Sequence, residues 1–164
     1  HRVGMRPIIR LHPPIAIALV LAVATWGPRP AEAPAPGGGD EALGLHDELT
    51  SMLARGAAAW NRGDLDAFMS DYLPDERTSF VTNDGVLHGV DEVRSRYAPR
   101  FAPGGVRDSL SFESVETDWL APGVAYMNAV YVLSRGDSVV ARGPTSLVLV
   151  RREGRWLIVH DHSS

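Results

Sequence analysis

The sequence predicts one α+β domain in which helices come first and a meandering antiparallel sheet follows. Two amphipathic helical repeats precede residue 75, four alternating segments follow residue 108, and turns of only a few residues separate those segments. Turns that short join antiparallel neighbours. Helices segregated from strands are typical of α+β proteins rather than of alternating βαβ units.

Length and composition fit a single globular domain. The chain has 164 residues, of which 45% are hydrophobic and 22% charged, and this is enough to bury one core. From Asp40 onward, 12 arginines face 19 acidic residues. Such a surface repels phosphate backbones, so nucleic acid is not expected as a partner. The absence of cysteine excludes disulfides and thiolate metal sites.

Residues 1–39 are predicted to be a signal peptide and a linker, and residues 40–164 the folded domain. Arg6 precedes a twelve-residue apolar run, Ile15–Trp26, which is shorter than the roughly 20 residues of a spanning helix. Pro28–Gly39 is rich in proline and glycine, as flexible linkers are. We therefore expect a secreted or periplasmic protein, with membrane contact only if the leader stays uncleaved.

The helices are predicted from apolar residues that recur every three or four positions. The first is expected from Leu45 until Gly63, which suits a C-terminal cap. Asp64 can cap the second, and Pro74 ends it. The two apolar stripes are Leu45, Leu49, Met52, Leu53, Gly56 and Trp60, then Leu65, Phe68, Met69 and Tyr72.

A hairpin and a third helix are expected before the long strands. Asn83-Asp84-Gly85 is a strong turn signal between Thr78–Thr82 and Val86–His88. The third helix is expected from about Val90 to Tyr97, broken near Pro99. Period-two alternation then predicts strands over Ser109–Asp118, Val124–Leu133, Val139–Arg151 and Arg155–His162.

Three segments carry a resemblance to a known superfamily: Trp60–Phe68 at the helical turn, Gly85–Gly89 before the third helix, and Gly154–Ser164 at the end. Together with the element order, they resemble the nuclear transport factor 2-like superfamily, in its SnoaL-like branch, over about Leu45–Ser164. The terminal His-x-His-Ser looks like the subgroup related to the association domain of calmodulin-dependent kinase II. The resemblance implies a cystatin-like cone, in which a curved antiparallel sheet wraps the N-terminal helices around an apolar cavity, usually in a homodimer.

The superfamily includes ketosteroid isomerase, which uses an aspartate base with a tyrosine and a protonated aspartic acid as donors. Aligned on Gly63, those positions hold Gly56, Thr82, and Ser146 or Leu147 in this sequence. None of the three groups is present, so that reaction is not expected.

His160 and His162 are the candidate catalytic residues. Strict strand alternation places them on one face with Trp156 and Ile158, which indicates the apolar inner face. A histidine in an apolar pocket can act as acid or base near neutral pH. The alternative is a pair satisfied by polar neighbours or placed at a dimer contact. His-x-His is also a metal-ligand spacing, but nothing directs His88 towards the pair, so neither a metal nor a cofactor is expected.

Candidate ligand-binding residues come from the helices and the strands. Trp60, Tyr72, Phe80 and Tyr126 are expected to line the cavity, or else to be plain core. Asn128 shares the Tyr126 face, and a buried amide needs a partner or a ligand. The opposite face of this strand is the expected dimer contact, through Ala125, Met127, Ala129, Tyr131 and Leu133.

Arg142 is the sixth candidate ligand-binding residue. If it faces the cavity, its guanidinium can clamp a carboxylate; if it lies on the rim, it pairs with Glu113, Glu116 or Asp118. The expected ligand is therefore a small apolar or carboxylate-bearing molecule.

Three functions remain open on these observations. The first is an exported homodimer that binds a small molecule in an apolar cone-shaped pocket. The second is a SnoaL-like cyclase, isomerase or dehydratase that uses a pocket histidine as its acid-base group. The third is a non-catalytic dimeric assembly module. A scaffold shared by so many activities does not decide between them.

Overall fold

The computed structural model describes residues 38–164, and the expected signal peptide lies outside the described residues. The elements follow the predicted order, so the α+β class is confirmed. They are α1 (Gly39–Arg62), α2 (Leu65–Met69), β1 (Ser79–Thr82), β2 (Gly85–His88), α3 (Val90–Phe101), β3 (Ser109–Ala121), β4 (Val124–Arg135), β5 (Ser138–Arg152) and β6 (Arg155–Ser163).

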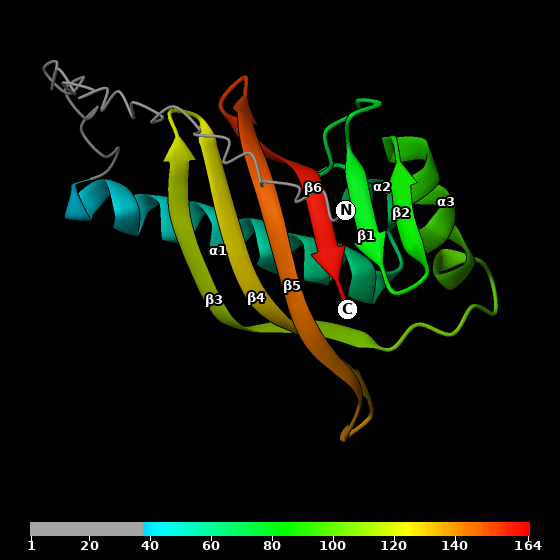
Figure 1. Cartoon of the computed structure of the whole chain (residues 1–164). Helices are drawn as coiled ribbons and strands as arrows, with labels where there is room; N and C mark the ends of the chain where they lie inside the picture. The colour runs from blue at the N-terminus through cyan, green and yellow to red at the C-terminus, as the bar shows by residue number, and fades with distance from the viewer. Residues whose placement is uncertain (1–37) are drawn as a thin grey trace, which may run out of the picture. The chain divides into compact units, whose positions relative to one another are not determined.

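One six-stranded sheet has the order β2-β1-β6-β5-β4-β3. The four long strands pair antiparallel with their sequence neighbours, as their short turns predict. The exception is β1, which lies parallel to β6 although the two are far apart in sequence. Figure 1 shows α1 crossing one face of the curved strands β3 to β6, with β1, β2 and α3 gathered at one end.

The helices begin and end where local chemistry requires. α1 buries the predicted stripe and ends at Gly63, whose φ of 80° favours glycine. The Asp64 side chain then accepts a hydrogen bond of 2.9 Å from the Ala67 backbone N–H, as a helix N-cap does. α3 differs from expectation, because it continues past Pro99 to Phe101. Pro99 lies in the last turn, where the helix is about to end in any case.

The core lies between α1 and the inner face of the sheet, and it reverses the expected faces of β4. Ala125, Met127 and Ala129 are buried against the helices rather than exposed at a dimer contact. Register places Met127 beside Leu147 of β5, and Leu147 beside Asp161 of β6, so all three share the inner face. The alternation alone did not indicate which face of β4 is turned towards the core.

A β-bulge interrupts β6. His160 pairs with Val148 of β5, whereas Ile158 pairs with the next residue of β5, Leu149. Val159 is therefore an extra residue, and an extra residue changes which side chains face inward. Before the bulge Trp156 and Ile158 are buried, and after it Asp161 is buried.

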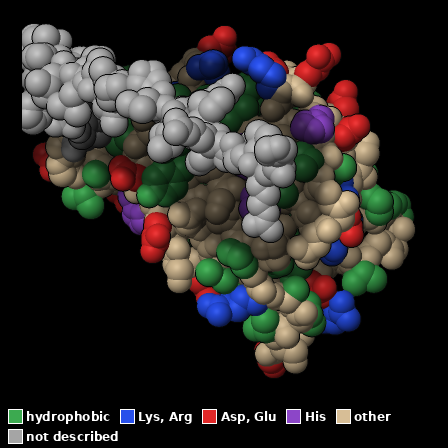
Figure 2. Space-filling view, viewed as in Figure 1, with side chains coloured by type: hydrophobic (Ala, Val, Ile, Leu, Met, Phe, Trp, Pro, Cys, Tyr) green, Lys and Arg blue, Asp and Glu red, His purple; other side chains and the backbone are tan. Residues whose placement is uncertain are grey.

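The face of the sheet turned away from α1 carries mixed side chains. In Figure 2 hydrophobic groups are scattered there among polar and charged ones. Register assigns Tyr126, Val148 and His160 to one row of this face, and Asn128 and His162 to the next row. Within residues 38–164, no helix combines the length and the apolarity needed to cross a membrane.

Candidate ligand-binding cavity

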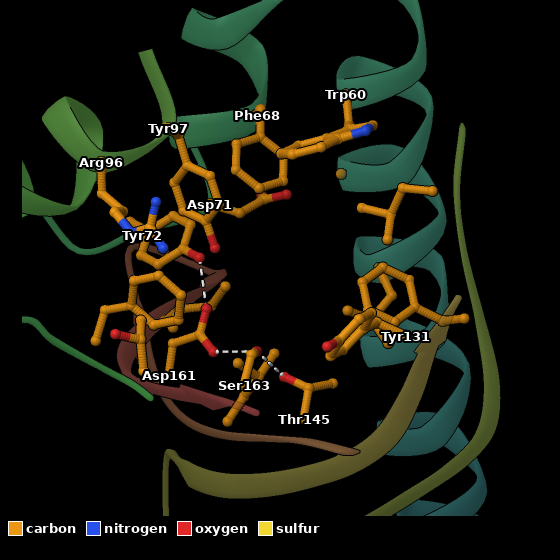
Figure 3. A pocket seen from close by; sticks show the side chains of 18 of the residues that line it. Trp60, Phe68, Asp71, Tyr72, Arg96, Tyr97, Tyr131, Thr145, Asp161 and Ser163 are labelled. Atoms are coloured by element: carbon orange, nitrogen blue, oxygen red, sulfur yellow. Dashed lines mark hydrogen bonds between the residues drawn. The ribbon is translucent and has the colours of Figure 1, made fainter. Parts of the chain in front are cut away.

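A cavity of about 380 Å³ opens between the helices and the inner face of the sheet. Such a volume is in the range of small-molecule sites. The side chains in Figure 3 surround it from α1, α2, α3 and the strands. Most are apolar or aromatic, and the polar ones gather at a few points. Its lining includes Met52, Leu53, Gly56, Trp60, Phe68, Asp71, Tyr72, Phe80, Thr82, Arg96, Tyr97, Arg100, Phe112, Tyr131, Thr145, Leu147, Ile158, Asp161 and Ser163.

A buried hydrogen-bond network forms one corner of the cavity. The Tyr72 hydroxyl donates to Asp161 Oδ2 at 2.7 Å, and the Ser163 hydroxyl donates to Asp161 Oδ1 at 2.9 Å. Thr145 Oγ1 lies 2.8 Å from Ser163 Oγ and extends the chain. The dashed lines in Figure 3 follow this network around the Asp161 carboxyl group. We call these four residues the Asp161 network.

Backbone pairing places the Tyr72 and Asp161 side chains together. The Ile158 N–H donates to the Asp71 carbonyl at 2.7 Å, and the Leu73 N–H donates to the Ile158 carbonyl at 2.8 Å. The segment after α2 thus lies along β6 just before the bulge, with Tyr72 beside Ile158. Beyond the extra Val159, Asp161 turns inward and meets the tyrosine hydroxyl.

Burial sets the electrostatics of this corner. It raises the pKa of the Asp161 carboxyl, although the hydrogen bonds from Tyr72 and Ser163 act in the opposite direction. Burial also raises the pKa of the Tyr72 hydroxyl well above its usual value, and the Asp161 charge adds to this. The corner therefore favours forms that carry protons over forms that carry negative charge.

Aromatic rings build the wall between α1, α2 and α3. Phe68 meets Trp60 and Tyr97 edge-on, with ring centroids 5.4 and 5.0 Å apart, and Tyr97 stacks on Phe80 at 5.5 Å. Such contacts hold the rings in place. A cavity with a rigid aromatic wall and one polar corner can orient a flat molecule with a single polar end.

Two further groups of charged residues, outside the Asp161 network, also line the cavity. Asp71 follows α2, and burial raises the pKa of its carboxyl while the charges of Arg55 and Arg155 lower it. Arg96 and Arg100 come from α3. Arg96 reaches Asp84 at 3.3 Å, and Arg100 lies over the Trp60 ring at 6.0 Å from its centroid.

Three of the six expected ligand-binding residues line the cavity: Trp60, Tyr72 and Phe80. Their contact with a ligand stays a prediction. Tyr126 and Asn128 lie on the outer face instead, because β4 turns Ala125, Met127 and Ala129 inward.

Arg142 takes the rim position, the second of its two expected placements. Its guanidinium donates to Glu113 Oε2 at 2.7 Å, and both side chains are exposed. It is not among the residues that line the cavity.

The expected placement of His160 and His162 beside Trp156 and Ile158 is wrong. The bulge at Val159 turns both towards the outer face of the sheet. His160 is half-buried, with Nδ1 2.8 Å from the Ser79 hydroxyl, and His162 is exposed. Among the described residues, no group of three or more histidine and acidic side chains is placed to hold a metal ion.

Sequence reasoning missed the polar residues that the cavity does contain. Asp161 stands between the two histidines. Because neighbouring side chains of a strand face opposite sides, the prediction that both histidines face inward implied that Asp161 faces outward. Asp71 directly precedes Tyr72 and follows Asp64 and Asp66, and acidic residues spaced in this way usually face solvent. The signal that could have found Asp161 is its place in a strand otherwise rich in apolar residues, since a buried strand rarely holds an acid without a role.

Comparison with known proteins identifies the family. The model of the SnoaL-like domain matches residues 49–164. A solved nuclear transport factor 2-like protein of unknown function from Shewanella oneidensis MR-1 is 29% identical, with a TM-score of 0.65, and the match covers 72% of this chain and 97% of that one.

Two other solved structures share the fold. A proposed dehydratase of the nuclear transport factor 2-like family from Streptomyces avermitilis is 20% identical over 74% of this chain and 95% of that one, with a TM-score of 0.63. A proposed scytalone dehydratase from Novosphingobium aromaticivorans is 11% identical over 76% and 85%, also with a TM-score of 0.63. No curated protein matches significantly. Because the family model covers most of the chain, this protein belongs to the SnoaL-like domain family and has a nuclear transport factor 2-like fold.

Proposed function

We propose that this domain binds a small, mainly apolar organic molecule whose polar group sits at the Asp161 network. The observation that carries the proposal is the combination of a 380 Å³ cavity, an aromatic wall and one buried polar corner. Ligand sites are typically apolar with a few placed polar groups. A collapsed cavity, as an assembly module would allow, is not what the described residues form.

The chemistry of the corner favours a ligand with a hydrogen-bond acceptor, such as a carbonyl. When the Asp161 carboxyl is protonated, it can donate to the Tyr72 oxygen, and the Tyr72 hydroxyl hydrogen is then free for the ligand. Burial, which raises the pKa of the Asp161 carboxyl, favours this arrangement. A carboxylate in the same corner would face two groups that resist negative charge, so the carboxylate-bearing ligand is the weaker option here.

The test is binding of 2-indanone, a flat bicyclic ketone, measured by isothermal titration calorimetry. Tyr72→Phe removes the hydroxyl and should weaken binding about tenfold, as loss of one good hydrogen bond does. Tyr126→Phe is the matched control, because it makes the same change on the outer face. Failure of the unaltered protein to bind 2-indanone, or equal losses in both variants, would refute the proposal.

A second candidate function is an acid-base enzyme of the dehydratase or isomerase kind, with Asp161 in place of a histidine. The raised pKa of the buried Asp161 carboxyl favours it, since catalytic acids are commonly tuned in this way. Two relatives in fold are described as proposed dehydratases, which agrees with this candidate. Exchange of substrate protons with solvent is the measurement that reports on it.

Export and dimerisation remain proposals as well. The apolar run Ile15–Trp26 supports export. A dimer would use the outer face of the sheet around Tyr126 and Val148, and not the expected face of Ala125 and Met127, which the core occupies.

A further inference from the structure

Asp71 differs from Asp161, the most deeply buried acidic residue of the cavity. The Asp161 carboxyl accepts hydrogen bonds from Tyr72 and Ser163. The Asp71 carboxylate has no hydrogen-bond or ion-pair partner among residues 38–164, although it is only partly exposed and lines the cavity. A ligand that displaces water from this carboxylate without replacing the hydrogen bond binds at a cost in free energy. The position of Asp71 is fixed, because the Asp71 carbonyl accepts the hydrogen bond from the Ile158 N–H.

Space is available directly beside this carboxylate. Gly56 of α1 faces it, and a Cβ atom at Gly56 would have Asp71 Oδ2, at 3.9 Å, as its only neighbour within 4 Å outside its own stretch of helix. Gly56 and Asp71 both line the cavity, so the missing side chain leaves room for a ligand atom next to the carboxylate oxygen. In Figure 3 the Asp71 side chain reaches the cavity on the same side as Tyr72 and Tyr97.

The charges around the cavity disfavour an ionic ligand at this point. A cationic group beside Asp71 would be repelled by Arg96 and Arg100, which line the same cavity, and by Arg55 and Arg155, whose charges act on Asp71. An anionic group would be repelled by the carboxylate itself. A neutral group that donates a hydrogen bond meets neither obstacle, and it supplies the missing partner of Asp71.

We propose that Asp71 is a specificity-determining residue that accepts a hydrogen bond from a neutral hydroxyl group of the bound molecule. The inference rests on the proposed ligand-binding function and narrows it. The ligand then carries a donor that faces Asp71 in addition to an acceptor that faces Tyr72. Molecules of similar shape that lack the donor bind more weakly, because they leave the carboxylate desolvated and unpaired.

The experiment compares 5-hydroxyindane with 5-methoxyindane, which are similar in shape and differ in having or lacking a donor. Isothermal titration calorimetry on the full folded domain should show about tenfold tighter binding of the hydroxyl compound. Asp71→Leu should remove this preference by weakening only 5-hydroxyindane. Asp71→Asn keeps an acceptor oxygen and should restore part of it. Asp66→Leu is the control, since the Asp66 side chain is 84% exposed and does not line the cavity, and it should leave the preference unchanged.

Charged analogues complete the test. Indane-5-carboxylate and 5-aminomethylindane should both bind more weakly than 5-hydroxyindane, and tighter binding of either one would overturn the inference. Equal affinities for the hydroxyl and methoxy compounds, or a preference that survives in Asp71→Leu, would also overturn the inference about Asp71. If both compounds still bind, the proposed ligand-binding function stands. If neither these compounds nor 2-indanone binds, the proposed function itself fails and the inference fails with it.

Discussion

In both halves of β6 the side chains alternate between the two faces of the sheet, but the bulge shifts which positions face inward. Before the bulge at Val159, the inward side chains are Trp156 and Ile158, which belong to the hydrophobic core. After it, the inward side chains are Asp161 and Ser163, which form the polar corner of the cavity. One strand thus serves two purposes, and a single extra residue separates them.

The difference teaches that stability and ligand recognition can be divided along one strand. Trp156 packs on Trp119 and donates to Glu48 Oε2 at 2.7 Å, but it is not among the residues that line the cavity. Asp161 is equally buried, yet its partners are side chains of the cavity wall. Changes at Trp156 should therefore alter folding, and changes at Asp161 and Ser163 should alter the site. Ile158, next to the bulge, belongs to both the core and the cavity wall.

The largest expected effect comes from the first half. Trp156→Ala removes a buried ring and should lower the free energy of unfolding by about 3–5 kcal/mol, a large part of the roughly 5–15 kcal/mol of a typical domain. Urea unfolding measures the loss, and calorimetry on the folded protein should show unchanged affinity for 2-indanone. Leu157→Ala, on the outer face, should cost much less. If Trp156→Ala instead weakened binding at unchanged stability, the division along β6 would be refuted.

An intermediate effect is expected on chemistry in the second half. If Asp161 is an acid-base group, the protein should accelerate exchange of the 2-indanone α-protons with deuterated solvent, and Asp161→Asn should slow this exchange about 100-fold. Proton NMR follows the exchange directly. His160→Asn should leave the rate unchanged, because His160 faces the other side of the sheet. A slower rate in His160→Asn would contradict this assignment and indicate that His160 is the acid-base group.

The smallest effect is a pH dependence of stability. Because burial raises the pKa of Asp161, the folded protein holds this proton more tightly than the unfolded chain does. The contribution of Asp161 to stability must then fall as the pH rises from the ordinary aspartate value of 3.8 through the raised pKa. The slope is at most about 1.4 kcal/mol per pH unit.

Asp161→Asn should lose this slope, so the stability difference between it and the unaltered protein should change with pH. Urea unfolding at several pH values from 4 to 7 measures the difference. Taking a difference removes the opposite contributions of Asp64 and Asp75, whose pKa values the fold lowers. An unchanging difference across this range would contradict the raised pKa. Asp84→Asn serves as the control for loss of an exposed carboxylate.

Much of the fold could be predicted because its signals are local. Apolar spacing identified α1 and α2, Gly63 and Asp64 marked the boundary between them, and short turns indicated antiparallel strands. The pairing of β1 with β6 was not predicted, since no short-range pattern reports which distant strands meet.

The candidate site could be predicted only in part, because alternation along a strand does not say which of its two faces is turned inward. Trp60, Tyr72 and Phe80 were placed by helical period or by their position in a short strand. On β4 both faces are largely apolar, so alternation did not indicate which one packs on α1. On β6 no glycine or proline stands next to Val159 to indicate a bulge. The bulge therefore exchanged the expected faces of His160 and Asp161.

The parallel pairing of β1 with β6 also sets an order of events during folding. Ser79 and His160 lie 81 positions apart in the chain, whereas β3 to β6 are joined by short turns and can pair as each hairpin closes. Closing a long loop lowers the entropy of the chain before any contact across the loop can form, so pairings between distant segments tend to form late. The walls of the cavity are drawn from Trp60, Phe80 and Asp161, three distant stretches of the chain. We therefore expect the contacts that enclose the cavity to form late in folding, after the hairpins of β3 to β6 have closed.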